Sequence, residues 1–241
     1  DHNKMAGIQV VVRSLLNHPN SSINFVSDFS LYKSIDLERI TNLSLTPTFA
    51  KMNLQLLRKI GQGHITLGGE VLSKHCFELI QRTGNFSLTN IYATSELGVV
   101  CRSNSYVFKL DVTIEVKDNF LFVLRNGLSI PTGDLVEMID SNNFVIKGRS
   151  DFAVNIGGRL TTRDELQSIY ESCPLIKLAK VSFKPNSVLG HVIQLEIMLN
   201  GQDNSLSDFK YWLKNSVPKS LWPMKTIQLK ESYKLSSNGK L

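Results

Sequence analysis

The sequence predicts an α/β protein that ends in a small α+β unit. Helix-like and strand-like segments alternate in its first half, a pattern that favours a helix–sheet layer with a largely parallel sheet. Residues 107–145 change to short strand candidates separated by turn residues. The second half then carries two amphipathic helix candidates and a strand of alternating polarity.

In the first half, the helix candidates share apolar residues spaced three and four apart, and they cover residues 8–16, 52–60 and 73–82. The strand candidates are short apolar runs over residues 23–26 and 65–67. Pro47 is expected to interrupt the segment before residue 52, and Gly84 is expected to cap the third helix. The second strand leads directly into Gly68-Gly69-Glu70.

The strand-rich middle contains four candidates, over residues 112–116, 120–124, 135–139 and 144–146. Asp118-Asn119 and Asn126-Gly127 supply turn chemistry between them. Taken alone, Pro131-Thr132-Gly133-Asp134 is read as a further turn, and Gly148-Arg149-Ser150-Asp151 as a linker.

In the second half, Thr162-Arg163-Asp164-Glu165 has the pattern of a capping box at the start of a helix. Leu166, Ile169, Tyr170 and Cys173 form one apolar stripe along that helix, and Pro174 ends it. Residues 191–199 alternate as a half-buried strand does, and residues 207–216 form a second amphipathic helix.

Composition excludes several classes of protein. The chain has 241 residues, of which 42% are hydrophobic, and its apolar runs are far shorter than the roughly 18 residues of a membrane span. The net charge of +6 suits an anionic ligand, but the basic residues are scattered, which indicates a solvated surface and no nucleic-acid partner.

The three cysteines show no CxxC spacing, so we expect neither a disulfide framework nor a zinc site. Free cysteines are typical of a reducing compartment, so we expect a cytoplasmic protein. The first residue is Asp and it runs straight into a helix-like stretch. We therefore expect a fragment of a longer protein.

Six short segments are unremarkable singly, but their order is informative. They are Gly68-Gly69-Glu70, Tyr92-Ala93-Thr94-Ser95-Glu96, Thr132-Gly133-Asp134, Gly148-Arg149-Ser150-Asp151, Gly157-Gly158 and Asn238-Gly239-Lys240. In this order the segments resemble the motifs of the adenylate-forming (AMP-binding) superfamily. That superfamily comprises acyl- and aryl-CoA synthetases, the adenylation domains of peptide synthetases, and luciferases. Fifteen residues separate Asp134 from Arg149, and this spacing also fits the family.

The resemblance implies a division of the chain into domains. Residues 1–148 would be the C-terminal part of the large α/β AMP-binding domain, including its strand-rich subdomain. Residues 149–241 would be the small α+β domain, with a hinge near Asp151. In the family this small domain rotates after adenylation, exchanging a catalytic lysine for a loop that delivers a thiol.

The resemblance also implies roles for individual residues. The catalytic residues would be Lys240, Ser95 and Glu96, with Glu96 also holding Mg²⁺, a cation that prefers carboxylate oxygen. The nucleotide (ATP or AMP) would be bound by Gly69, Glu70, Tyr92 (stacked on adenine), Ala93, and the ribose pair Asp134 and Arg149. The acid pocket would include His2, Gly7, Thr48, Gly68 and Thr94. Gly157 and Gly158 would form the thiol-delivery loop.

The function so implied is ATP-dependent activation of a small carboxylic acid as acyl-AMP. Transfer to a thiol would follow, either of CoA or of the phosphopantetheine on an acyl carrier protein. The family's phosphate-binding loop is absent from the sequence, so the alternative is a degenerate or truncated relative that serves as a non-catalytic nucleotide-binding or interaction module. A basic nucleic-acid-binding module is a third reading, and it rests on the +6 charge alone.

Overall fold

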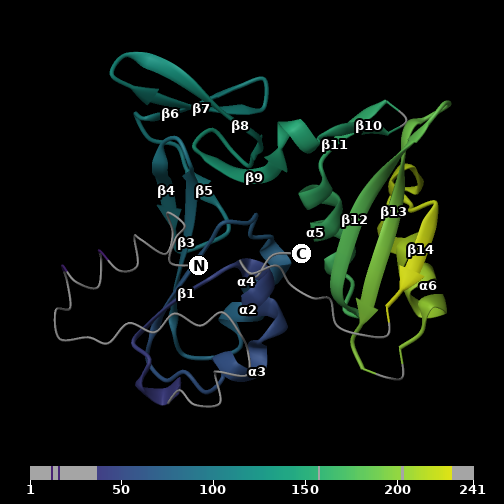
Figure 1. The fold of residues 1–241 in the computed structure, drawn as a ribbon, viewed down its shortest axis with the longest axis horizontal. Coiled ribbons are helices and arrows are strands. Elements are labelled where there is room, and N and C mark those ends of the chain that lie inside the picture. Colours follow the sequence, from purple (N-terminus) through teal and green to yellow (C-terminus); the bar gives the residue numbers. More distant parts are fainter. Residues whose placement is uncertain (1–11, 13–15, 17–36, 157, 202–203, 230–241) are drawn as a thin grey trace. The chain divides into compact units, whose positions relative to one another are not determined.

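The structure, a computed structural model, describes residues 12, 16, 37–156, 158–201 and 204–229 (Figure 1). The helix predicted over residues 8–16, apart from Val12 and Leu16, and the strand predicted over residues 23–26 lie outside these ranges. The described residues form two compact units that divide between Phe108 and Lys109.

The first unit is built on a four-stranded sheet in the order β1-β2-β3-β4, with three parallel strands and an antiparallel fourth. Its strands are β1 (Asn42–Leu45), β2 (His64–Gly68), β3 (Ser87–Thr94) and β4 (Gly98–Ser103). The largely parallel sheet is thus confirmed, and β2 contains the strand predicted over residues 65–67. β1 is only four residues long, too short for its alternation to be recognised in the sequence.

Three short helices pack on one face of this sheet: α2 (Pro47–Met52), α3 (Leu54–Leu57) and α4 (Lys74–Gln81). A single 3-10 turn, η2 (Leu37–Arg39), precedes β1. Ile65 and Leu67 of β2 point into the same core as Leu57 and Ile80. Pro47 begins a helix instead of interrupting one, because a proline in the first turn loses no helical hydrogen bond. The predicted cap at Gly84 is wrong, since α4 ends at Gln81 and its C-cap is Arg82, in right-handed helical geometry.

The strand-rich part of the second unit is a sheet in the order β5-β9-β8-β7-β6 (Figure 1). Its strands are β5 (Phe108–Lys109), β6 (Ile114–Lys117), β7 (Phe120–Arg125), β8 (Leu128–Met138) and β9 (Asn143–Arg149). Asp118, Asn119, Asn126 and Gly127 all have positive φ, as tight hairpin turns require. Both predicted turns are thus confirmed.

The turn read at Pro131-Thr132-Gly133-Asp134 is wrong, because these residues lie inside β8. Phe120 pairs with Leu135 while Phe122 pairs with Pro131, so β8 carries two extra residues opposite β7. Gly133 has φ 76° within this irregularity. A glycine and a proline that would end a strand elsewhere make a bulge here, which is where strands tolerate them.

The remainder of the second unit is an α+β layer whose sheet has the order β11-β10-β13-β12, with β14 beside β13. Its strands are β10 (Val154–Ile156), β11 (Arg159–Thr161), β12 (Ile176–Asn186), β13 (Gly190–Leu199) and β14 (Lys225–Gln228). Its helices are η3 (Ser150–Phe152), α5 (Arg163–Glu171), α6 (Leu206–Ser216) and η4 (Lys219–Leu221). The predicted stripe on α5 is confirmed, since Leu166, Tyr170 and Cys173 are buried with Phe209 of α6.

The capping box predicted at Thr162 is half formed. The Thr162 hydroxyl accepts a hydrogen bond from the Glu165 amide at 3.1 Å, as expected, but the Glu165 carboxylate bonds to neighbouring side chains instead. A complete capping box joins Ser205 and Asp208 at the start of α6.

The three cysteines all lie in the described ranges, and none of them forms a disulfide. In the ranges the structure describes, no helix is long and apolar enough to span a membrane.

Candidate functional site

Three segments that carry predicted site residues follow parallel strands of the first unit, so they lie at one edge of its sheet. Thr46-Pro47-Thr48 comes after β1, Gly68-Gly69-Glu70 ends and follows β2, and Thr94-Ser95-Glu96 ends and follows β3. The carboxyl ends of parallel strands lie side by side, and this edge is where α/β proteins bind ligands. Residues up to 50 positions apart in the sequence are therefore gathered by topology alone.

The first two of these segments are joined directly. The carboxylate of Glu70 accepts a hydrogen bond from the backbone amide of Thr48 at 2.9 Å. Gly69 adopts φ 80°, and a Cβ at Gly68 would lie 3.2 Å from the Ile91 carbonyl oxygen. Glycine at both positions lets the chain turn sharply and stay close to β3. The Thr48–Glu70 hydrogen bond thus connects the loop after β1 to the loop after β2, and these loops carry the predicted pocket residues Thr48 and Gly68.

The third segment is a strand end and a turn. Tyr92 and Ala93 stand on either side of a register shift between β3 and β4, and the Tyr92 ring lies 6.3 Å from that of Phe108, tilted by 58°. The Thr94 hydroxyl accepts a hydrogen bond from the Leu97 amide at 3.1 Å, which closes the turn. Ser95 and Glu96 are exposed at that turn. The hydroxyl and carboxylate predicted to meet phosphate and metal are therefore accessible.

In the second unit, the predicted ribose pair and the predicted hinge residue form one cluster. Asp134 and Arg149 are cross-strand partners of β8 and β9. The Arg149 guanidinium lies 3.9 Å from the buried Asp134 carboxylate and 2.8 Å from the Asp151 carboxylate. A forked guanidinium can hold two carboxylates at once while part of it faces solvent. Sequence spacing placed these residues fifteen apart, and strand register brings them together.

The bulge in β8 supplies two backbone carbonyls as further partners that the sequence did not identify. The Thr132 carbonyl accepts a hydrogen bond from Arg149 at 2.8 Å, and the Gly133 carbonyl accepts one from the Ser150 hydroxyl at 2.8 Å. A Cβ at Gly133 would lie 3.0 Å from the Arg149 guanidinium. Backbone carbonyls carry no sequence signal, and only the glycine at position 133 could have indicated the close approach.

Gly158 lies in the exposed turn between β10 and β11 with φ 91°, and its amide donates to the Asn155 side chain at 2.8 Å. A Cβ there would meet nothing within 4 Å, so the backbone conformation, not space, favours glycine. The predicted site residues His2, Gly7, Gly157 and Lys240 lie outside the described residues.

A hollow of about 320 Å³ lies elsewhere on the first unit, over strands β2, β3 and β4. Polar side chains line much of it, including His64, Thr66, Thr89 and Arg102. None of the predicted site residues belongs to its lining. The predicted site is thus an edge formed by strand ends and turns, and this hollow is separate from it.

The carboxylate of Glu96 is the side chain predicted to bind Mg²⁺. In the described part of the chain, no group of three or more His, Cys, Asp or Glu side chains could hold a metal ion. Mg²⁺ commonly binds through one or two carboxylates together with substrate phosphates, so the single exposed carboxylate of Glu96 is compatible with it. The described side chains alone do not form a metal site that is complete without a substrate.

Comparisons with known proteins agree on the fold. No protein-family model matches the chain. Over 214 residues the chain is 25% identical to a component of the plipastatin synthase of Bacillus subtilis (strain 168), covering 86% of this chain and 8% of that protein. ATP-bound MatB from Rhodopseudomonas palustris superposes with a TM-score of 0.76 at 16% identity, over 100% of this chain and 57% of that one. The anthranilate CoA ligase AuaEII in complex with anthranoyl-AMP gives a TM-score of 0.71 at 13% identity, over 91% and 52%.

The chain spans about half the length of these solved relatives and a small part of the synthase. The structural likeness is far stronger than the sequence identity, because a fold is retained long after most side chains have changed. The mixed sheets and the order of motifs both agree with it. The chain therefore has the same fold as these solved adenylate-forming enzymes, AuaEII and MatB.

Proposed function

We propose that the protein activates a small carboxylic acid with ATP, forming an acyl-AMP and pyrophosphate, and then transfers the acyl group to a thiol. The observation that carries this proposal is the cluster of Arg149 between Asp134 and Asp151. A nucleoside ribose offers two adjacent hydroxyls, which a carboxylate acceptor beside a guanidinium donor is suited to bind. Asp134 is buried and oriented by its strand, so it would be preorganised for that contact.

Further residues would take the nucleotide roles that the family resemblance implies. Tyr92 would stack on the adenine, Ser95 would donate a hydrogen bond to the α-phosphate, and Glu96 would hold Mg²⁺. When bound, the Mg²⁺ ion supplies neutralising charge for the phosphate oxygens. Lys240 would bring a compact positive charge to the α-phosphate and the acid.

The acid would lie against the edge of the first unit, where Thr48, Gly68 and Thr94 meet. The side chains there are small or hydroxyl-bearing, which favours a compact acid over a long acyl chain. An ionised carboxylate is a poor electrophile, which is why it is first converted to an acyl-AMP. The transition state of that step gathers negative charge on phosphate oxygens, so the main catalytic requirement is hydrogen-bond donors and cations positioned to stabilise that charge.

The thiol acceptor would be CoA or a carrier-protein phosphopantetheine, approaching past the Gly157-Gly158 segment after a rotation near Asp151. The open space around Gly158 supports such a passage. We propose both kinds of acceptor, since AuaEII is a CoA ligase and a component of plipastatin synthase is similar to this chain in sequence. We also propose a cytoplasmic protein.

The first prediction concerns the nucleotide. Asp134→Asn removes the acceptor charge but keeps the side-chain shape, so AMP should bind at least tenfold more weakly to the variant, about the 1.4 kcal/mol of one lost polar contact. Calorimetric titration of the chain with AMP gives the measurement. Asp118→Asn, at an exposed hairpin turn, is the matched control and should bind AMP as the unmodified chain does.

ATP–pyrophosphate exchange over a panel of carboxylic acids then separates catalysis from binding. Exchange with one acid, abolished by Lys240→Ala, would support adenylation and name the substrate class. AMP binding with no exchange for any acid would favour the nucleotide-binding module instead. Equal AMP affinity in the unmodified chain and Asp134→Asn would contradict the ribose-binding role of Asp134.

A further inference from the structure

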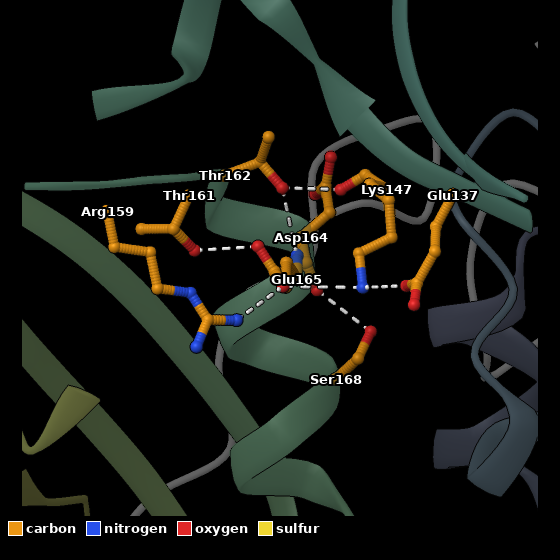
Figure 2. A network of polar contacts seen from close by, with 8 residues as sticks. All are labelled: Glu137, Lys147, Arg159, Thr161, Thr162, Asp164, Glu165 and Ser168. Atoms are coloured by element: carbon orange, nitrogen blue, oxygen red, sulfur yellow. Dashed lines mark hydrogen bonds and ion pairs between the residues drawn. The ribbon is translucent and has the colours of Figure 1, made fainter. Parts of the chain in front are cut away.

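The ammonium group of Lys147 joins two carboxylates from different elements of the second unit (Figure 2). Lys147, on β9, lies 2.9 Å from Glu137 on β8 and 3.3 Å from Glu165 on α5. Its side chain is 28% exposed and that of Glu165 only 12%. The charges are thus partly withdrawn from water, where an ion pair is screened less than at an open surface.

Glu165 is held from its other side as well. Its carboxylate lies 3.1 Å from the Arg159 guanidinium of β11 and accepts a hydrogen bond from the Thr161 hydroxyl at 2.8 Å. Figure 2 shows Arg159 and Thr161 on one side of this carboxylate and Lys147 on the other. The residue at the third position of α5 therefore connects the strand-rich sheet to the start of the α+β layer.

The backbones of β9 and α5 also come close at this point. The Thr162 hydroxyl, which caps α5, donates a hydrogen bond to the Lys147 carbonyl oxygen. A Cβ at Gly148 would lie 2.6 Å from an Asp164 carboxylate oxygen and 3.0 Å from the Thr162 hydroxyl. The strand can approach the helix start this closely only because position 148 is glycine, here with φ 125°.

We propose that the Glu137–Lys147–Glu165 bridge is a positioning device that holds the start of α5 on β9. It thereby stabilises the orientation of the α+β layer relative to the strand-rich sheet in which these contacts form. Lys147 lies two residues before Arg149, where the chain passes from the strand-rich sheet to the α+β layer. None of the residues of this bridge belongs to the proposed nucleotide or acid contacts, and the rotation proposed near Asp151 would break the bridge, so the bridge holds one of the two orientations of that rotation.

The pKa shifts of Lys147 and Glu165 both favour the charged forms that the bridge requires. Burial alone would lower the pKa of Lys147, but the hydrogen bond to Glu137 and the charge of Glu165 outweigh it and raise that pKa above its ordinary value. Burial would likewise raise the pKa of Glu165, yet Thr161 and Lys147 together lower it. Both groups are therefore charged around neutral pH.

A second ion pair of the same unit provides the contrast. Lys117 lies 2.8 Å from Glu115, but these two side chains are 53% and 33% exposed and both belong to β6. A pair within one strand cannot orient two elements, and exposed pairs contribute little to stability. Lys117→Met is therefore a matched control for Lys147→Met.

The test measures a distance between the two halves of the unit. Spin labels at Val112→Cys and Val188→Cys, whose parent residues are 91% and 85% exposed, report it in a Cys101→Ser background. Pulsed electron spin resonance should give one narrow distance population for the labelled parent and for Lys147→Arg, which keeps the charge. Lys147→Met and Glu165→Gln should at least double the width of that population, while Lys117→Met should not change it.

An unchanged narrow population in Lys147→Met would overturn the proposal. Equal broadening in Lys147→Met and Lys117→Met would also overturn it, because the effect would then be general loosening. If Lys147→Met does not fold, Glu137→Gln gives the same test, since it removes only the outer acceptor, which is 57% exposed. ATP–pyrophosphate exchange is a separate experiment, so the two proposals can fail independently.

Discussion

Gly148 and Arg149 are neighbours with opposite requirements. Gly148 must lack a side chain, because Asp164 and Thr162 occupy the space where a Cβ would stand. Arg149 must have a long one, since its guanidinium reaches Thr132, Asp134 and Asp151. The sequence Gly148-Arg149 was readable as a linker, but the structure shows both residues at the end of β9, each in close contact.

The corresponding prediction is that Gly148→Ala destabilises the second unit by roughly 2–4 kcal/mol, since it combines an unfavourable positive φ with a steric clash. Gly127→Ala is the matched control, because Gly127 has φ 76° but nothing within 4 Å of its would-be Cβ. It should lose only about 1–2 kcal/mol of backbone energy. Urea unfolding of both variants measures the difference, and equal losses would show that the close approach at Gly148 costs nothing.

Helix α5 contributes buried side chains to the core of the α+β layer. Its inner face buries Leu166 and Tyr170, and the Tyr170 hydroxyl donates to the Leu221 carbonyl oxygen of η4 at 2.6 Å. Burial raises the pKa of Tyr170, so the phenol stays protonated as a donor. The stripe was visible in the sequence, but its polar partner 51 residues away was not.

Tyr170→Phe should therefore lower the free energy of unfolding by about 1–3 kcal/mol, because it leaves a buried carbonyl without its donor. Tyr211→Phe makes the same chemical change on α6, where the side chain is 74% exposed, and should stay within about 0.5 kcal/mol of the parent. Thermal or denaturant unfolding distinguishes the two. A Tyr170→Phe variant as stable as Tyr211→Phe would mean that water replaces the lost donor.

Across the molecule, stability should depend on pH through the carboxylates that are charged and paired in the folded state. Glu165 faces Lys147 of β9, Arg159 and Thr161 of β11, and, through Lys147, Glu137 of β8. Its folded pKa is lowered. Its contribution is therefore fully present above its unfolded pKa of about 4.3 and is lost as the pH falls through the folded value.

Glu165→Gln should accordingly be less stable than the parent at pH 7, and the difference should shrink between pH 5 and pH 3. Thermal unfolding midpoints of both proteins over this range give the measurement. Asp118→Asn, at an exposed turn, should track the parent throughout. A parent–Gln difference that stays constant with pH would mean that the Glu165 charge contributes nothing to stability.

Much of the fold could be predicted from local patterns. The helix at residues 73–82, the hairpin turns at Asp118-Asn119 and Asn126-Gly127, and the strand at residues 191–199 are all present. Periodicity and turn chemistry act over a few residues, so they are legible in one sequence. The turn predicted at Pro131-Thr132-Gly133-Asp134 was wrong because the local pattern does not decide it. Whether such residues form a turn or a bulge depends on the strands beside them.

The sequence by itself determined the α/β class, the amphipathic helices, and a resemblance carried by the order of six weak motifs. It could not determine which side chains meet, because contacts such as Thr48 with Glu70 or Arg149 with Asp134 depend on strand register and on the order of strands in each sheet. It also gave no sign of the Glu137–Lys147–Glu165 bridge, whose members come from three elements. Only tertiary structure decides such contacts, since the free energy that brings distant segments together comes from burying whole faces of helices and sheets.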